Sequence, residues 1–175
     1  MRSKLLSLHL VLTILNTHMN IFADPRSIIF SASSNESTPF IQATKQYLCL
    51  CISRNAVSLT PQVFELSVEI FWRVLSGLRT KLKASSFFLL SSRSKLIDFI
   101  QPEIEVLLNQ IFIPLLEIRT SSLKQKAVTL DMLFRLCQDP QALVEIYLNY
   151  DCDEEAAENI YERQVHDKSF IVYTF

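Results

Sequence analysis

The sequence predicts an all-α fold, an armadillo- or HEAT-like stack of antiparallel helices. Apolar residues recur every three or four positions over most of the chain, which is the period of one helix face. Capping residues and prolines stand where several of these segments begin. The chain has a single glycine, Gly77, whereas tight β-hairpin turns usually require glycine. No segment has a convincing strand period, so we expect helices joined by polar turns.

Length and composition indicate one folded domain and exclude several functional classes. A chain of 175 residues, 49% hydrophobic and 20% charged, is long enough and apolar enough to fold around a core. Phosphate-binding loops, dinucleotide-binding turns and nucleophile elbows all need more glycines than this chain has. The net charge is -1 and the basic residues are scattered. No nucleic-acid partner is therefore expected.

The four cysteines do not indicate a metal site. Cys49 and Cys51 form a C-x-C pair, whereas Cys137 and Cys152 stand alone and the histidines are distant in the sequence. A structural zinc site usually combines two closely spaced pairs of ligands. We interpret the cysteines as buried free thiols, which suits a reducing cytosol. No cofactor is expected.

The first helix is predicted over residues 2–20, ending before Asp24. Its apolar residues recur at positions 5, 8, 12, 15, 19 and 22, which share one helix face. The alternative is a signal peptide, because Arg2 and Lys4 precede an apolar segment and Ala23 offers a cleavage point. That alternative predicts a small secreted or signal-anchored helical protein. No apolar run reaches the ~18 residues of a membrane span, so no transmembrane segment is expected.

A polar loop and a second helix follow. Residues 31–39 are mostly Ser, Asn, Glu, Thr and Pro, and we predict a loop there. Residues 40–53 are predicted to be helical.

The third helix is predicted to start at Thr60 and Pro61, a capping hydroxyl followed by a first-turn proline. Glu69 and Arg73 are spaced for an ion pair on its outer side. Trp72, at the edge of the apolar stripe, is interpreted as a buried anchor. The predicted core stripe consists of Phe64, Val68, Phe71, Leu75, Leu78 and Leu82.

Two further helices are predicted in the second half. The first covers residues 103–118 and contains Pro114, so we expect a kink near residue 110, whose carbonyl loses its partner. Ser122 and Gln125 form a capping box that opens the next helix. The predicted inward residues of the first are Ile104, Leu107, Leu108, Ile111, Phe112 and Leu115, and the apolar row of the second is Leu123, Ala127, Leu130, Phe134 and Cys137.

Two short helices are predicted to follow, one capped by Asp139 and running through Tyr147, the other running through about Tyr161. Between them lies a segment, 148–155, with more polar residues than one helix end needs. Asp151 or Asp153 would cap the last helix, and the Asp151-x-x-Glu154 spacing fits a capping box. We therefore favour a cap.

The same acidic segment has two other interpretations. Asp151 and Asp153 could bind a divalent metal or act as an acid–base pair, and the segment could be a partner-binding turn. A calcium loop requires a glycine and a distant bidentate glutamate, which do not follow here. A catalytic pair requires a nucleophile or histidine partner, and the sequence nominates none.

The segment 138–153, QDPQALVEIYLNYDCD, closely resembles the end of the HUS domain of the large Golgi guanine-nucleotide exchange factors for Arf GTPases. The HUS box of that family matches completely, as Asn149, Tyr150, Asp151, Cys152 and Asp153. Segments 3–8, 45–49, 62–67, 103–109 and 121–126 also match. The resemblance spans about residues 2–20, 39–83 and 103–163, and is closest to fungal trans-Golgi members.

The resemblance implies a cytosolic, non-catalytic regulatory domain that acts in vesicle transport as a peripheral protein of the trans-Golgi membrane. The HUS box would contact the N-terminal dimerisation domain of the parent protein and contribute to homodimer organisation. Small GTPases of the Arf and Rab classes would be indirect partners. The catalytic Sec-seven domain would lie downstream, so no exchange activity is expected from this chain.

Two segments depart from the family pattern. Residues 84–101 interrupt a join that resembles a continuous run from Lys83 to Glu103, and the pattern ends after Arg163. We therefore expect a truncated HUS-type domain over residues 1–165, interrupted by the insertion 84–101, and a tail at 166–175. Our hypothesis is that both departures are translated intron sequence, which sequencing of the transcript tests. The alternative for 84–101 is a lineage-specific surface loop.

Overall fold

The computed structural model describes residues 2–24, 26–31, 35–84, 106–140 and 143–144. The chain divides into two compact units, residues 1–100 and 101–175. The described part is mainly helical, and its strands form one two-stranded sheet. The predicted all-α class is therefore confirmed, whereas the armadillo-like stacking stays a prediction.

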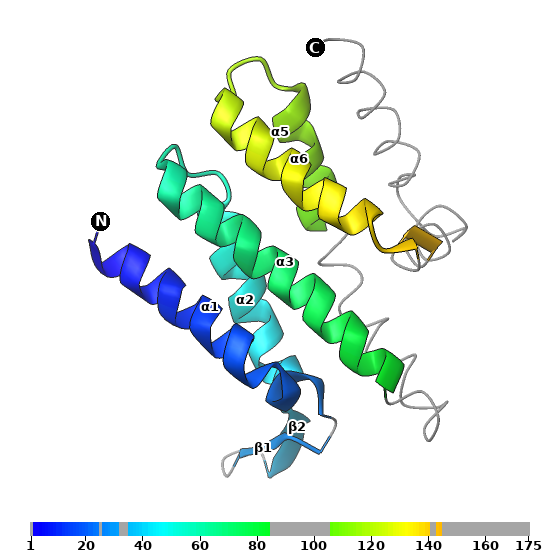
Figure 1. The fold of residues 1–175 in the computed structure, drawn as a ribbon. Coiled ribbons are helices and arrows are strands. Elements are labelled where there is room, and N and C mark those ends of the chain that lie inside the picture. The colour runs from blue at the N-terminus through cyan, green and yellow to red at the C-terminus, as the bar shows by residue number, and fades with distance from the viewer. Residues whose placement is uncertain (1, 25, 32–34, 85–105, 141–142, 145–175) are drawn as a thin grey trace. The chain divides into compact units, whose positions relative to one another are not determined.

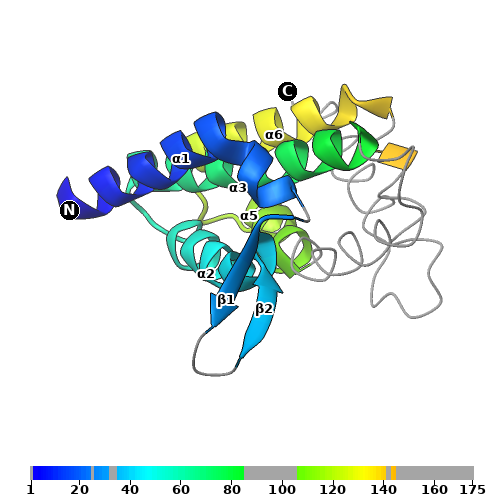
Figure 2. The same cartoon turned by 90° about the horizontal axis from the view of Figure 1, so that it is seen from below.

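The described part of the first unit contains three helices: α1 (Arg2–Ala23), α2 (Phe40–Asn55) and α3 (Pro61–Ala84). α1 and α3 lie side by side and run in the same direction, and α2 returns behind them (Figures 1 and 2). The three helices start where the sequence predicts. α1 extends beyond residue 20 and is interrupted at His18, whose backbone (φ -125°, ψ 23°) is not helical.

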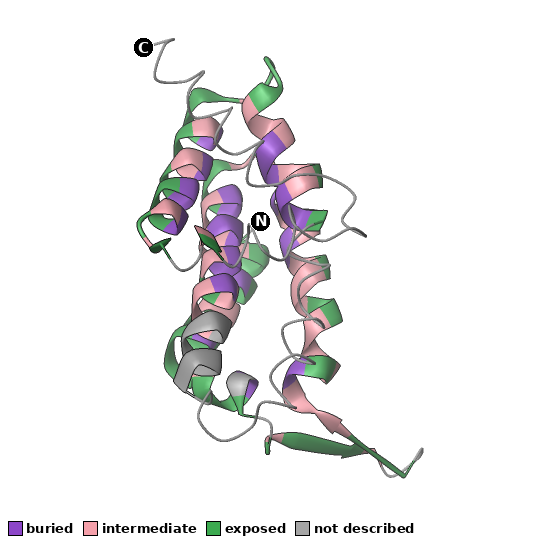
Figure 3. Ribbon diagram, turned by 90° about the vertical axis from the view of Figure 1, so that its right-hand side faces the viewer, coloured by how far each residue is buried: buried purple, intermediate pink, exposed green. Residues whose placement is uncertain are grey.

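The core of the first unit consists of the inward faces of these helices, where buried residues alternate with exposed ones (Figure 3). α1 contributes Leu8, Leu15 and Phe22, which are seven residues apart and so share one helix face. The predicted α3 stripe is confirmed over the part whose side chains are described. Its buried residues are Phe64, Val68, Phe71 and Leu75, together with Val63, Ser67 and Ile70.

The predicted loop at residues 31–39 is wrong in part, because a β-hairpin occupies most of it. Strand β1 (Ile28–Ser31) pairs antiparallel with β2 (Glu36–Pro39), with Ile28 opposite Pro39. Just before β2, Asn35 adopts the left-handed backbone (φ 53°), which asparagine tolerates better than most residues. Both faces are largely exposed, so no apolar–polar alternation marked these strands in the sequence.

In the second unit, residues 106–107 are helical, and the π-helical turn η1 (Leu108–Phe112) leads directly into α5 (Ile113–Glu117). The N–H of Ile113 donates to the carbonyl of Leu108, five residues back. This widened turn lies where a break was predicted, because a regular helix would press the ring of Pro114 against the carbonyl of Gln110. The extra residue moves Ile113 into the core beside Phe112, whereas Ile111 is only half-buried.

Helix α6 (Leu123–Cys137) forms as predicted, but its predicted apolar row is not the face that is buried. Leu123 and Phe134 are 78% and 60% exposed. The buried residues are Gln125, Thr129, Met132, Leu133 and Leu136. Two rows of α6 carry apolar side chains, and the spacing alone could not decide which row meets α5. The capping glutamine and Thr129, whose hydroxyl donates to the carbonyl of Gln125 at 3.0 Å, lie on the buried side.

Candidate interaction surface

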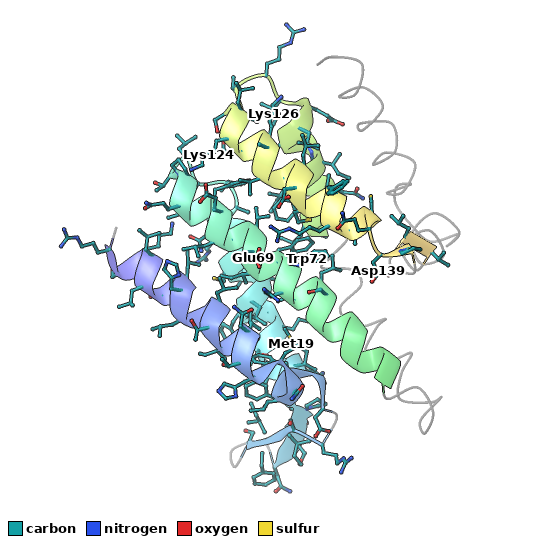
Figure 4. All side chains as sticks on the ribbon, viewed as in Figure 1. Met19, Glu69, Trp72, Lys124, Lys126 and Asp139 are labelled. Atoms are coloured by element: carbon teal, nitrogen blue, oxygen red, sulfur yellow. The ribbon has the colours of Figure 1, made fainter. Side chains whose placement is uncertain are left out.

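The sequence-predicted site, Asn149, Tyr150, Asp151, Cys152 and Asp153, lies outside the described residues. The structure describes the chain up to the start of the short helix that precedes it. The N–H of Leu143 donates to the carbonyl of Asp139 at 3.3 Å, and the backbone is helical at residues 140 and 143–144. The predicted helix start after Asp139, labelled in Figure 4, is therefore confirmed.

The turn before α6 holds a well-defined polar cluster. The side chain of Ser122 accepts from the N–H of Gln125 at 3.1 Å, and Gln125 Oε1 accepts from the N–H of Ser122 at 3.1 Å. Lys126 Nζ donates to the carbonyl of Leu116 at 2.7 Å (Lys126 is labelled in Figure 4). These bonds satisfy the N–H groups of Ser122 and Gln125 at the start of α6 and one of the last carbonyls of α5. Their role is to fix the turn between the two helices.

The second unit also contains a polar atom that the sequence reasoning missed. Asn109 Oδ1 is buried in the π-helical turn and has no hydrogen-bond partner among the described residues. Wide helical turns recur at functional positions, and a buried acceptor without a donor costs free energy. The signal that could have located it is Pro114, which imposes the wide turn.

The cysteines and acids of the described residues do not form a metal site. Cys49, Cys51 and Cys137 are half-buried and not disulfide-bonded. No group of three histidine, cysteine or acidic side chains gathers in the described part of the chain. The prediction that these thiols are buried is therefore only partly confirmed. Cys152 lies outside the described residues.

On α3, the predicted ion pair forms, with 3.2 Å between Arg73 Nε and Glu69 Oε1. Trp72 is half-buried and not the fully buried anchor that we predicted (Figure 4). Beside this pair lies a shallow depression of about 380 Å³ between α1 and α3. Its lining is Leu15, Asn16, Thr17, Met19, Asn20, Arg73, Ser76 and Gly77. Half of these residues carry a side-chain amide or hydroxyl, and no nucleophile–base pair is among them.

The largest feature that the sequence reasoning missed is the outer face of α1. Leu6, Leu10 and Ile14 are 62%, 55% and 48% exposed, although the helix packs on α3 through its other face. By length and composition, α1 is the one described helix that could cross a membrane, and 17% of its apolar window is buried. Its buried residues Leu8, Leu15 and Phe22, which are spaced by seven, show that it packs as a helix of the first unit.

A known family matches most of the chain. The model described as Mon2/Sec7/BIG1-like, HUS domain, matches residues 1–159. The matched range includes the first helix, which favours a domain helix over an export signal. It also includes the acidic segment at residues 149–153.

Individual relatives agree with this match. The chain is 47% identical over 165 residues to the ADP-ribosylation factor guanine nucleotide-exchange factor sec71 of Schizosaccharomyces pombe. It is 43% identical over 171 residues to human brefeldin A-inhibited guanine nucleotide-exchange protein 1, and 38% over 152 residues to SEC7 of Saccharomyces cerevisiae. These alignments cover 94%, 98% and 87% of this chain but only 8%, 8% and 6% of the relatives.

Proposed function

This chain belongs to the Mon2/Sec7/BIG1-like HUS domain family, and on that basis we propose that it is a regulatory and interaction domain of an Arf guanine-nucleotide exchange factor. The matched region is the HUS domain and not the catalytic Sec7 domain. The observation that carries the proposal is this match over residues 1–159, together with identities of 38–47% to three exchange factors. The domain itself would have no exchange activity.

We further propose that the HUS box, residues 149–153, is the docking segment. Tyr150 would contact the N-terminal dimerisation domain of the parent protein, and Asp151 and Asp153 would hold the turn in shape by capping the next helix. This arrangement would contribute to homodimer organisation. Support comes from the resemblance of Asn149, Tyr150, Asp151, Cys152 and Asp153 to the family's box, and from the family match over residues 1–159, which includes them.

The proposed setting is Golgi vesicle transport, in the cytoplasm and peripherally on the trans-Golgi membrane. Arf- and Rab-class GTPases would be engaged through the parent protein. The domain would extend over residues 1–165, with the insertion at 84–101 and a tail at 166–175. The support is the similarity to exchange factors of the sec71, SEC7 and brefeldin A-inhibited types.

The docking proposal is tested by calorimetric titration of the full chain with the N-terminal dimerisation domain of a family member. Tyr150→Ala should weaken binding at least tenfold, because a buried aromatic anchor carries much of an interface's energy. The matched control is Tyr47→Ala, which removes a tyrosine that is 73% exposed on α2 and should leave binding unchanged. Equal affinities of wild type and Tyr150→Ala would contradict the proposal.

A further inference from the structure

The β-hairpin of the first unit has one edge with open backbone groups. The hairpin projects beyond the helices that it connects, α1 and α2 (Figure 2). The N–H of Phe40 donates to the carbonyl of Ser27 at 2.7 Å, so these two residues form a hydrogen-bonded pair. Such pairs alternate with non-hydrogen-bonded ones along an antiparallel ladder, and the register therefore places Ile28 and Phe30 in non-hydrogen-bonded pairs. The N–H and C=O groups of Ile28 and Phe30 point away from β2, toward the open edge of β1.

The two edges of the hairpin differ in how they are protected against pairing. β2 contains Pro39, which has no N–H to donate, and the charged Glu36. Proline and charge are among the features by which natural sheets block an edge. β1 has the sequence IIFS, which contains neither, and its Ile28, Ile29 and Phe30 are 58%, 41% and 60% exposed. A two-stranded hairpin is only marginally stable in water, so a strand added to β1 would stabilise it.

The open groups of β1 have a self-complementary spacing. Two copies of β1 can pair antiparallel with Ile29 opposite Ile29, which places Ile28 of each copy opposite Phe30 of the other. The residues with open N–H and C=O groups then face each other and form the hydrogen-bonded pairs of an antiparallel ladder. Ile28 and Phe30 also become cross-strand neighbours, a favourable pairing of a β-branched with an aromatic side chain, and the two Ile29 side chains meet on the other face.

The charges at the ends of the hairpin fit the same arrangement. β1 contains no charged residue, so two copies do not repel each other along the paired edge. Arg26 precedes β1; its side chain is 94% exposed, and its Nε lies 3.8 Å from Asp24 Oδ1. Glu36 is exposed at the opposite end of the hairpin. Antiparallel pairing brings the Arg26 end of one copy to the Glu36 end of the other, so charges of opposite sign approach each other.

We propose that the open edge of β1 binds the same edge of a second copy of this chain, which joins the two hairpins into one antiparallel sheet. Each copy contributes one short strand, and the contact is smaller than a standard protein interface. The dimer is therefore weak and reversible. The proposal goes beyond the docking role of residues 149–153 and does not depend on it.

The first test is sedimentation velocity of the full chain over about a hundredfold range of concentration, in which we expect a shift from monomer to dimer. Ile28→Pro removes an outward N–H and leaves the bonds between β1 and β2 in place, so it should weaken the dimer about tenfold. The matched control is Ser37→Pro, which removes an outward N–H from the edge of β2 and should leave the dimer unchanged.

The second test is a charge exchange at Ile29, which probes the register directly. Ile29→Lys and Ile29→Glu each place like charges opposite each other, so each variant alone should stay monomeric. An equimolar mixture of the two should recover the dimer, because opposite charges then face each other. Circular dichroism checks that each variant keeps the helix content of the wild type.

Three results would overturn the proposal: a wild type that stays monomeric, equal weakening by Ile28→Pro and Ser37→Pro, or a mixture that associates no better than its components. Tyr150→Ala should leave this dimer unchanged. Loss of association in Tyr150→Ala but not in Ile28→Pro would place self-association elsewhere, so the two proposals fail separately.

Discussion

At the residue scale, Gly77 is a position where the packing depends on the absence of a side chain. It lies on α3 against Met19 of α1, the residue labelled in Figure 4. A Cβ at this position would come within 2.5 Å of Met19 Cε and 2.7 Å of Met19 Cγ. Glycine in a helix interior costs about 1 kcal/mol relative to alanine, so it is retained here for the close approach of the two helices.

We predict that Gly77→Ala destabilises the first unit by about 1 kcal/mol, because displacing Met19 outweighs the gain in helix propensity. In the Met19→Ala background the same change should stabilise, since the crowding is gone. Urea unfolding of the wild type, both single variants and the double variant gives the coupling energy. Additive effects would show that the two residues do not restrict each other.

At the scale of the element, the sequence correctly predicted where the helices start, but it predicted the buried face correctly for α3 and not for α6. Ser122 and Gln125 have the spacing of a capping box, and their bonds form as expected. Spacing could not choose between the two apolar rows of α6, because the choice depends on what packs against it. The strands β1 and β2 were not predicted, because both their faces are largely exposed and apolar and polar residues do not alternate along them. The burial of Ile113 was not predicted either, because the π-helical turn adds a residue and rotates Ile113 toward the core.

The candidate site shows the same limit. A motif can be matched residue by residue, as at Asn149 to Asp153, without any local pattern that gives its geometry. The outer row of α1 was visible in the sequence only as extra leucines and isoleucines in an apolar segment. Its exposure depends on tertiary packing, because α3 covers the side that contains Leu15.

We predict that Ser122→Ala destabilises the helical hairpin of α5 and α6 by about 1 kcal/mol, since the N–H of Gln125 loses its acceptor. The matched control is Ser121→Ala, one position earlier, where no side-chain cap is made to α6. Amide hydrogen exchange should speed up in the first turn of α6 for the Ser122 variant alone. Equal effects of the two substitutions would argue against the capping role.

At the scale of the whole molecule, the feature to explain is the division into two units at residues 100 and 101. The division falls at the end of the segment 84–101, the insertion proposed above. In stacked helical domains each layer is stabilised by its neighbours, so we expect an insertion between two layers of the predicted stack to lower their cooperativity. A long insertion also adds loop-closure entropy, which grows only slowly with length. We therefore expect a change in cooperativity to be the larger effect of the proposed insertion.

For this reason we predict that removal of residues 84–102, which joins Lys83 directly to Glu103, produces one cooperative domain. We expect a single thermal unfolding transition for the shortened chain, with a midpoint several degrees above that of the 175-residue chain, since about 1 kcal/mol corresponds to ~2–4 °C at this size. Scanning calorimetry measures both the number of transitions and the midpoints. A replacement of 84–102 by a glycine–serine linker of equal length controls for sequence effects and should not raise the midpoint. An unchanged or lower midpoint for the shortened chain would identify the insertion as a genuine part of the fold.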